Sequence, residues 1–350
     1  MNTDAIVLRT HGGPEVLRRE TIPLPDPGPR EIRVRVRAVA LNHLDIWTRR
    51  GLPHVKHEYP HRLGADIVGE VDALGPGARA AYGMTLAPGE KVVVSPGLSC
   101  GVCAACLGGR DNLCKQYHIM GESAQGGYAR HINVPDANIL PYPEGVPFTE
   151  AAAVPLAFLT AWQMLVHKAK VRPGQTVLVQ AAGSGVSSAA IQIAKLHGAR
   201  VIATTGTDEK MERARALGAD EVINYTTHDF VAECKRLTGR RGVDCVVEHV
   251  GGDVFVKSIL ATAWGGRVVT CGATAGFTPQ VDLRQIFFRQ VEVLGSTMGS
   301  KGDLFDILAL VKAGALRPVV DRVMPLWDAA EAHRVLEERR AFGKVVLEVD

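Results

Sequence analysis

The chain of 350 residues exceeds the usual size of one domain, and 46% hydrophobic residues supply enough apolar surface for two cores, so we expect two globular domains. Its 40 basic and 37 acidic residues leave a formal net charge of +3, with no long block of either sign. This balance argues against a nucleic-acid-binding protein and against an acidic membrane as a partner.

The first residues, "MNTDAIVLRTHGG", lack a basic segment followed by an apolar one, and the most apolar later stretch, residues 151–166, contains polar interruptions. We therefore expect a soluble cytoplasmic protein. Of the seven cysteines, three are scattered through apolar segments, as expected for reduced, buried thiols: Cys234, Cys245 and Cys271.

Short strands broken by glycine and proline are predicted up to about residue 150. In "IRVRVRAVA", Ile32, Val34 and Val36 alternate with arginines, a period of two that predicts a half-buried strand. The alternation already explains the arginines as a solvated strand face, so they are not evidence for nucleic-acid binding.

Four cysteines in "SCGVCAACLGGRDNLC" can close round one tetrahedral metal ion. Intervals of three, three and eight residues leave no open coordination position, which favours a closed structural zinc site made by Cys100, Cys103, Cys106 and Cys114. Disulfides or a C-x-x-C redox pair remain alternatives, disfavoured by the cytoplasmic assignment and by the fourth cysteine.

From about residue 155, apolar strands alternate with helical stretches, a pattern that predicts a parallel sheet covered on both faces. The strand "TVLVQ" runs into "AAGSGVSSAAIQ", where a tight turn and the start of a helix would bind a pyrophosphate with Gly183, Ser184, Gly185 and Val186. Because Ser188 replaces the third glycine of G-x-G-x-x-G, a plain structural turn is the alternative.

Cofactor preference is predicted from the end of the next strand. About 20 residues past Gly185, where NAD-binding folds carry a carboxylate for the ribose hydroxyls, the chain has neutral Thr205, and Lys210 lies nearby. These residues favour NADPH. Lys210 as a solvated residue of the helix begun at Asp208 is the alternative, and Asp208 or Glu209 at the ribose would permit NADH.

The whole chain resembles the medium-chain dehydrogenase/reductase superfamily, which includes zinc alcohol dehydrogenases and NADPH quinone reductases. The resemblance runs from "GGPEVL" to "GKVVL", through "PGEKVVV", the cysteine lobe, "GGYARH", "PLAFLTAW", the glycine-rich loop and "ALGADEVINY". It implies an α/β protein: a doubly wound parallel Rossmann sheet at 155–298, and a GroES-like β-barrel catalytic domain at 1–154 that resumes at 299–350. The lobe at 95–116 would hold one structural zinc per chain.

The resemblance also shows which residues of the family's catalytic zinc site are missing. The family's alcohol dehydrogenases bind that zinc through a cysteine, a histidine and a second cysteine; the matching positions here are Asn42 in "ALNHLD", Ala65 in "LGAD" and Leu156 in "PLAFLTAW". We therefore expect no catalytic zinc of the usual kind. An improvised site remains an alternative, as do solvated loop histidines, at His43, His54, His57 and His61.

Without a Lewis acid, hydride transfer to quinones or α,β-unsaturated carbonyls is easier than alcohol oxidation, so we predict an NADP(H)-dependent reductase acting on a small molecule. Asn42 would position nicotinamide or substrate, unless it caps a turn. His43 would supply a proton or meet a phosphate, unless it is merely exposed, and Asp45 would order the local backbone. The family's catalytic tyrosine is replaced near Pro53, leaving Tyr59 as a weak substitute.

Further cofactor contacts are implied by the resemblance. Thr160 would lie near the nicotinamide ring and Tyr225 on the adenosine side, and Gly272 with Ala273 would complete the set after the strand "GRVVTC". The apolar strand "VEVLGS" would join subunits in a homodimer or homotetramer. An alcohol dehydrogenase and a nucleotide-binding protein without turnover remain the alternative functions.

Overall fold

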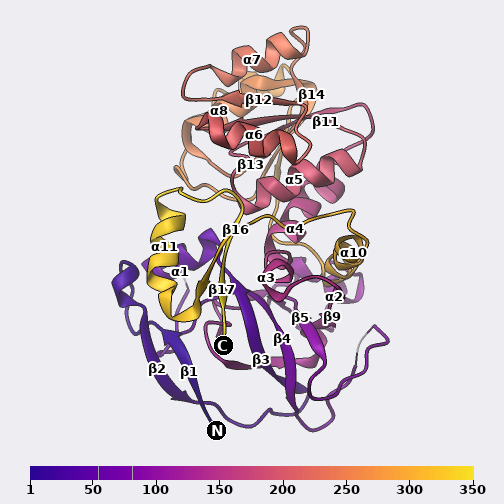
Figure 1. Cartoon of the computed structure of the whole chain (residues 1–350). Helices are drawn as coiled ribbons and strands as arrows, with labels where there is room; N and C mark the ends of the chain where they lie inside the picture. The colour runs from indigo at the N-terminus through magenta and orange to yellow at the C-terminus, as the bar shows by residue number, and fades with distance from the viewer. Residues whose placement is uncertain (54, 81) are drawn as a thin grey trace. The chain divides into compact units, whose positions relative to one another are not determined.

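The computed structural model describes residues 1–53, 55–80 and 82–350, and the chain forms two compact units (Figure 1). The first unit joins Met1–Leu159 to Gly299–Asp350, and the second is Thr160–Met298. The units divide within α4 (Pro155–Trp162). The first turn of α4 is tied to the first unit, because the N–H of Leu156 donates to Asp66 at 2.7 Å.

The first unit is built on a mixed sheet in the order β16-β17-β3-β4-β5-β9, with β8 also paired to β3. The C-terminal strand β17 lies antiparallel beside β3, with Val346 opposite Ala40. Both ends of the chain therefore build this unit, as the resemblance implies. The strands are β3 (Glu31–Ala40), β4 (Asp66–Leu74), β5 (Lys91–Val94), β8 (His131–Pro135), β9 (Ile139–Pro141), β16 (Val320–Pro325) and β17 (Lys344–Glu348).

Smaller elements surround this sheet. Strands β1 (Asn2–Val7) and β2 (Arg18–Pro23) form an antiparallel pair, as do β6 (Gly97–Leu98) and β7 (His118–Ile119). The helices are α1 (His43–Arg50), α2 (Ala104–Leu107), α3 (Phe148–Ala151), α10 (Lys301–Lys312) and α11 (Ala329–Glu337), with short 3-10 turns that include η1 (Pro14–Val16).

The second unit contains a parallel sheet in the order β12-β11-β10-β13-β14-β15. Counted from β10, this is the order 3-2-1-4-5-6 of doubly wound dinucleotide-binding folds, which confirms the predicted fold class. The elements in chain order are β10 (Thr176–Val179), α5 (Gly185–Leu196), β11 (Arg200–Thr205), α6 (Asp208–Ala216), β12 (Glu221–Asn224), α7 (Phe230–Leu237), β13 (Val243–Glu248), α8 (Gly252–Ala261), β14 (Thr262–Thr270), α9 (Arg284–Phe287) and β15 (Glu292–Gly295).

Each unit has its own apolar core. Ile32, Val34 and Val36 of β3 are buried in the first core, while Arg33 on the other face pairs with Asp72, as the alternation predicts. In the second unit the core gathers strand residues and the helices packed on them. The segment Phe148–Lys168 is long and apolar enough to cross a membrane by length and composition, but 72% of its most apolar window is buried within the protein, as in a core helix.

Candidate functional site

A buried network in the first unit joins Asn42, Asp66 and Lys344. Asn42 caps the N-terminus of α1, Asp66 begins β4, and Lys344 begins β17. The Lys344 ammonium donates to Asn42 Oδ1 at 2.6 Å and to Asp66 Oδ2 at 2.8 Å, and Asn42 Nδ2 donates to the same Asp66 oxygen at 3.0 Å. All three side chains are nearly inaccessible to solvent, so the contacts are strong and their geometry is well defined.

The positions that would carry a catalytic zinc do not fit one. Ala65 offers only a buried methyl group, and Leu156 takes part through its backbone N–H, which donates to Asp66 Oδ1. The Asn42 amide oxygen is occupied by the Lys344 ammonium. These three residues therefore do not form a site for a catalytic metal ion.

Asp45 and His43, both on α1, act differently in this region. The Asp45 carboxylate accepts the backbone N–H of Asn42 at 2.7 Å and of Gly64 at 2.8 Å, which holds the chain around Asn42 in place. Burial raises the pKa of Asp45 to about 6 despite these bonds. Burial, followed by the charge of Arg339, lowers the pKa of His43 to about 4, so its imidazole is neutral at pH 7.

The other histidines proposed for an improvised metal site are engaged with backbone. His57 and His61 have ring centroids 4.3 Å apart, and their Nε2 atoms bond the carbonyls of Glu122 and Gly121. His54 lies outside the described residues. Among the described residues, the one group of three or more side chains that brings its ligand atoms close enough for a metal is the cysteine cluster.

The cysteine lobe fits a structural zinc. The sulfur atoms of Cys100, Cys103, Cys106 and Cys114 all lie within 4.8 Å of one another, and the Sγ of Cys106 is 3.5 Å from Cys103 and 3.9 Å from Cys100. Four sulfurs about 2.3 Å from a tetrahedral zinc are separated by about 3.8 Å. The backbone N–H groups of Val102 and Cys103 lower the pKa of Cys100 to about 6, which favours the thiolate that binds metal. Bound there, zinc would supply a structural cross-link.

The glycine-rich turn of the second unit has the geometry of a pyrophosphate site. Strand β10 ends at Val179, and α5 begins at Gly185 with Ser184 as its N-cap. The Ser184 hydroxyl accepts the N–H of Ser187 at 3.0 Å, while the N–H groups of Gly185 and Val186 lie in the first turn, where no helical carbonyl precedes them. Gly183 lies in the same turn.

His249 contacts this turn from another strand, and the sequence did not point to it. It follows β13, the strand beside β10, and its Nε2 lies 2.8 Å from Ser187 Oγ and 3.2 Å from Ser184 Oγ. A strand-end position beside β10 would have been the available signal, since ligands bind where the strand order reverses.

The remaining predicted cofactor residues lie in the same unit, at or just after strand ends and in two helices. Thr205 is buried at the end of β11 and its hydroxyl donates to the Thr207 carbonyl. Lys210 lies in the first turn of α6, and the hydroxyl of exposed Tyr225 lies against Gly206. Gly272 and Ala273 follow β14, and Thr160 is buried in α4.

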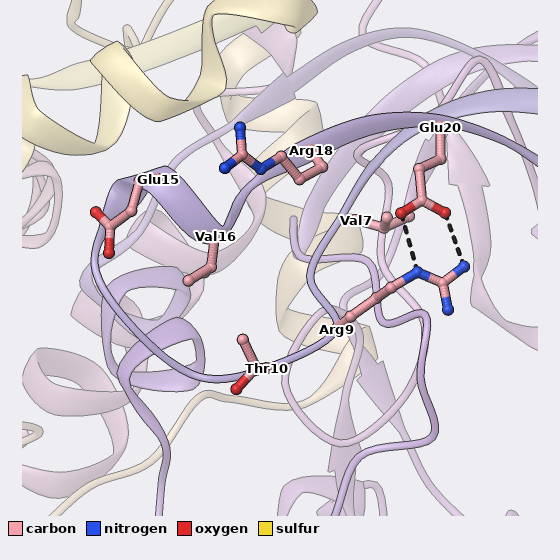
Figure 2. Close-up of a pocket in the computed structure, with 7 residues that line it drawn as sticks. All are labelled: Val7, Arg9, Thr10, Glu15, Val16, Arg18 and Glu20. Carbon is pink, nitrogen blue, oxygen red and sulfur yellow. Dashed lines mark hydrogen bonds and ion pairs between the residues drawn. The ribbon is translucent and has the colours of Figure 1, made fainter.

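A separate surface hollow of about 240 Å³ lies between β1, η1 and β2 (Figure 2). Its charged wall is the two-bonded ion pair of Arg9 with Glu20, at 3.0 and 2.9 Å. The residues that line it are Val7, Arg9, Thr10, Glu15, Val16, Arg18 and Glu20. None of the predicted site residues is among them.

Comparison with known proteins agrees with this architecture. Residues 28–144 match the family model of the alcohol dehydrogenase GroES-like domain, and residues 185–313 match that of zinc-binding dehydrogenases. The chain is 29% identical to the quinone oxidoreductase of Homo sapiens over 344 residues, covering 96% of this chain and 94% of that protein. It is 30% identical to a NAD-dependent alcohol dehydrogenase of Sulfurisphaera tokodaii over 340 residues, covering 95% and 96%.

A solved structure of a NAD-dependent alcohol dehydrogenase is 56% identical, with a TM-score of 0.95 over 99% of this chain and 100% of that one. The chain belongs to the medium-chain dehydrogenase/reductase superfamily. The predicted superfamily, its GroES-like and Rossmann folds, and an NAD(P)H-dependent oxidoreductase activity are thereby confirmed.

The structural zinc of this superfamily member can be tested by metal analysis. We expect about one zinc per chain, and Cys103→Ser should release it and lower the thermal unfolding temperature by several degrees, because the cross-link across the lobe is lost. Cys234→Ala, which removes a buried thiol far along the chain in α7, should leave the zinc content unchanged. Two zinc ions per chain, with one lost together with activity, would contradict the assignment.

Proposed function

We propose that this oxidoreductase transfers hydride from NADPH to quinones or α,β-unsaturated carbonyl compounds without a catalytic zinc. The observation that carries the proposal is the side-chain set at the three zinc-ligand positions, where Asn42 is bound to Lys344 and Asp66 and the other two positions are apolar. Similarity to a quinone oxidoreductase along almost the whole chain supports it.

Reduction of a conjugated carbonyl suits this set of residues. Bound NADPH supplies the hydride. The hydride bonds to the β-carbon, the alkene π electrons shift onto the carbonyl oxygen, and a proton from solvent completes the product. Asn42 would donate to the developing oxyanion, since within the described residues the second proton of its Nδ2 meets only the carbonyl of Ala40, at 3.5 Å. Neutral His43 would relay the proton.

Alcohol oxidation is the second candidate, favoured by the 56% identity to a NAD-dependent alcohol dehydrogenase. This reaction requires removal of the hydroxyl proton and stabilisation of an alkoxide, for which the superfamily's zinc enzymes use the metal. The same similarity favours NADH. Two observations argue against NADH. Strand β11 ends in neutral Thr205, and the nearest carboxylate along the chain, Asp208, already accepts a hydrogen bond from Asn224 through Oδ1 at 2.9 Å.

We also propose that the protein is cytoplasmic and forms a homodimer or homotetramer. All seven cysteines are unpaired thiols, which supports a reducing compartment. Strand β15 is the edge of the parallel sheet, and exposed apolar side chains lie on it and on the nearby elements of the second unit, a set that supports subunit contact: Trp264, Phe277, Leu283, Phe287, Phe288 and Val293.

The acceptor class can be tested by steady-state kinetics on a matched quinone, enone and alcohol set, with and without added zinc. We expect quinone or enone reduction to outrun alcohol oxidation, and zinc to have no effect. Asn42→Ala should lower kcat/KM by about tenfold or more, because a donor to the oxyanion is lost. Asn133→Ala, an amide on β8 bonded to Pro25, is the control. Fast alcohol oxidation that rises with zinc, beside negligible reduction of the other acceptors, would overturn the proposal.

Cofactor preference can be tested by binding titration with NADPH and NADH. We expect tighter NADPH binding, and Lys210→Ala should weaken it by roughly 1 to 2 kcal/mol while leaving NADH nearly unchanged, because a charge-assisted contact with the 2'-phosphate is lost. Lys235→Ala on α7 is a matched control, exposed and on another helix. Equal affinity of the unmodified protein for the two cofactors would refute the preference.

Subunit association can be tested by light scattering coupled to gel filtration. The chain of 37.5 kDa should elute as a dimer or tetramer, and Phe287→Asp should shift it towards the monomer, because a charge would then be buried in the contact. Val323→Asp, which changes an exposed apolar residue of the first unit, should leave the mass unchanged. A monomeric unmodified protein would rule the contact out.

A further inference from the structure

The Lys344 ammonium is bound to Asn42, which stands at one of the three sequence positions that carry the catalytic zinc ligands in the superfamily's alcohol dehydrogenases. Two of its three protons are directed to Asn42 Oδ1 and to Asp66 Oδ2, at 2.6 and 2.8 Å. Its side chain is only 5% exposed, and that of Asp66 is fully buried. A buried ion pair of this kind is stable only when both charges are present and hydrogen-bonded.

The contact with Lys344 fixes the orientation of the Asn42 amide. An ammonium group has no acceptor, so the amide atom that faces Lys344 must be Oδ1. Nδ2 is then directed to Asp66, which as a carboxylate can only accept. With both ends of the amide assigned in this way, the flipped rotamer would place two donors against each other at Lys344.

The same contact changes the chemistry of the amide. The positive charge of Lys344 beside the amide oxygen draws electron density from the amide nitrogen. In a buried site this polarisation strengthens the Nδ2–H group as a donor. One proton of Nδ2 is held by Asp66, and in the described part of the chain the other meets only the carbonyl of Ala40. That second proton is the one the proposed function directs at the substrate oxygen.

We propose that Lys344 is a positioning residue for hydride transfer, which orients and polarises Asn42 by an ammonium in place of a metal ion. The inference rests on the proposed function, in which Asn42 meets the developing oxyanion. Lys344 itself need not touch the substrate. Its effect reaches the reaction through the amide and through the charge balance of Asp66.

Other titratable groups face this network and must be allowed for. Asp45 and His43 lie on α1, and the charge of Lys344 acts on the pKa of both, while the charges of Asp45 and Asp66 act on Tyr128. Arg339, Glu337 and Arg50 act on His43. A variant at Asp66 is therefore needed to separate its protonation from that of its neighbours.

The kinetic test replaces Lys344 by methionine, which keeps the length of the chain and removes the charge, and by arginine, which keeps the charge. We expect Lys344→Met to lower kcat for the quinone or enone by about tenfold, with the Kd for NADPH changed less than about twofold, since the amide donor is weakened while the cofactor site in the second unit is intact. Lys344→Arg should recover much of the loss. Lys301→Met, which removes a half-buried ammonium bonded to Asn138, should leave kcat unchanged.

A second measurement needs no turnover. In Lys344→Met, Asp66 is a buried carboxylate without its cation, which is costly when the carboxyl is ionised and not when it is protonated. The destabilisation is therefore absent where folded and unfolded chains are both protonated, grows as pH rises above about 3.9, where an exposed aspartate ionises, and levels off once the folded carboxyl is ionised too. The deficit in unfolding temperature relative to the unmodified protein should therefore increase from about pH 5 to pH 8, and Asp66→Asn added to Lys344→Met should abolish this increase.

The outcomes separate the inference from the proposed function. Wild-type kcat in Lys344→Met, with Asn42→Ala still impaired, would overturn the role of Lys344 and leave the proposed function standing. The role also fails if Lys344→Arg is as slow as Lys344→Met, or if the stability deficit is the same at all pH values with and without Asp66→Asn. If quinones and enones are not reduced at all but the pH-dependent deficit is found, the ion pair is established and the acceptor class is wrong.

Discussion

The antiparallel pairing of β17 with β3 is the constraint on which the candidate site depends. Lys344 and Asn42 are 302 positions apart in the chain. They meet because Val346, two residues after Lys344, lies opposite Ala40, two residues before Asn42. A strand that slipped by one residue would turn Lys344 to the other face of the sheet. The same strand joins β16 to β3 within the sheet and completes the charge balance at Asp66.

In the proposed function, the four-cysteine lobe and the Asn42 network take the two roles that zinc enzymes of the superfamily assign to two metal ions. The lobe has thiolates at spacings that suit a closed tetrahedral site, and such a site holds loops together. The network has a carboxylate, an amide and an ammonium, which can orient a donor but cannot polarise a substrate oxygen as strongly as a divalent ion. This difference is the physical reason for proposing conjugated acceptors, which need less stabilisation than an alkoxide, as the substrates.

Sequence reasoning reached the fold for physical reasons that differ from one element to another, while the cofactor residues stay a prediction. Apolar and charged residues alternate with a period of two in the strand "IRVRVRAVA", and the alternating strands and helices of the second unit predict a parallel sheet. The architecture therefore follows from local sequence patterns. The cysteine lobe is local as well. The role of Lys344 could not be predicted from its motif "GKVVL", because that role depends on a pairing between strands from opposite ends of the chain. Leu156 was judged by its side chain, whereas the structure uses its backbone N–H.

A second network, centred on Arg49, holds α1 against α11 within the first unit. Arg49 on α1 is fully buried, and its guanidinium donates to the Gly12 carbonyl at 3.1 Å, lies 2.9 Å from His333 Nδ1 and pairs with Glu337 on α11. Burial lowers the pKa of His333 to about 3, so this histidine is neutral and can accept from the guanidinium through Nδ1.

Because α1 begins next to Asn42 and α11 leads into β17, this link fixes the helix that presents the amide against the strand that presents Lys344. Removing Glu337 would leave the fully buried Arg49 guanidinium short of a partner, a larger cost than loss of the contact of the exposed Arg50 with the same carboxylate, which is worth about 0–1 kcal/mol. The position of the ammonium therefore depends on the pairing of β17 with β3 and also on this link between the two ends of the chain. A site that relies on one hydrogen-bonded amide needs such a link, since an amide displaced by about 1 Å no longer meets the oxygen on which charge develops.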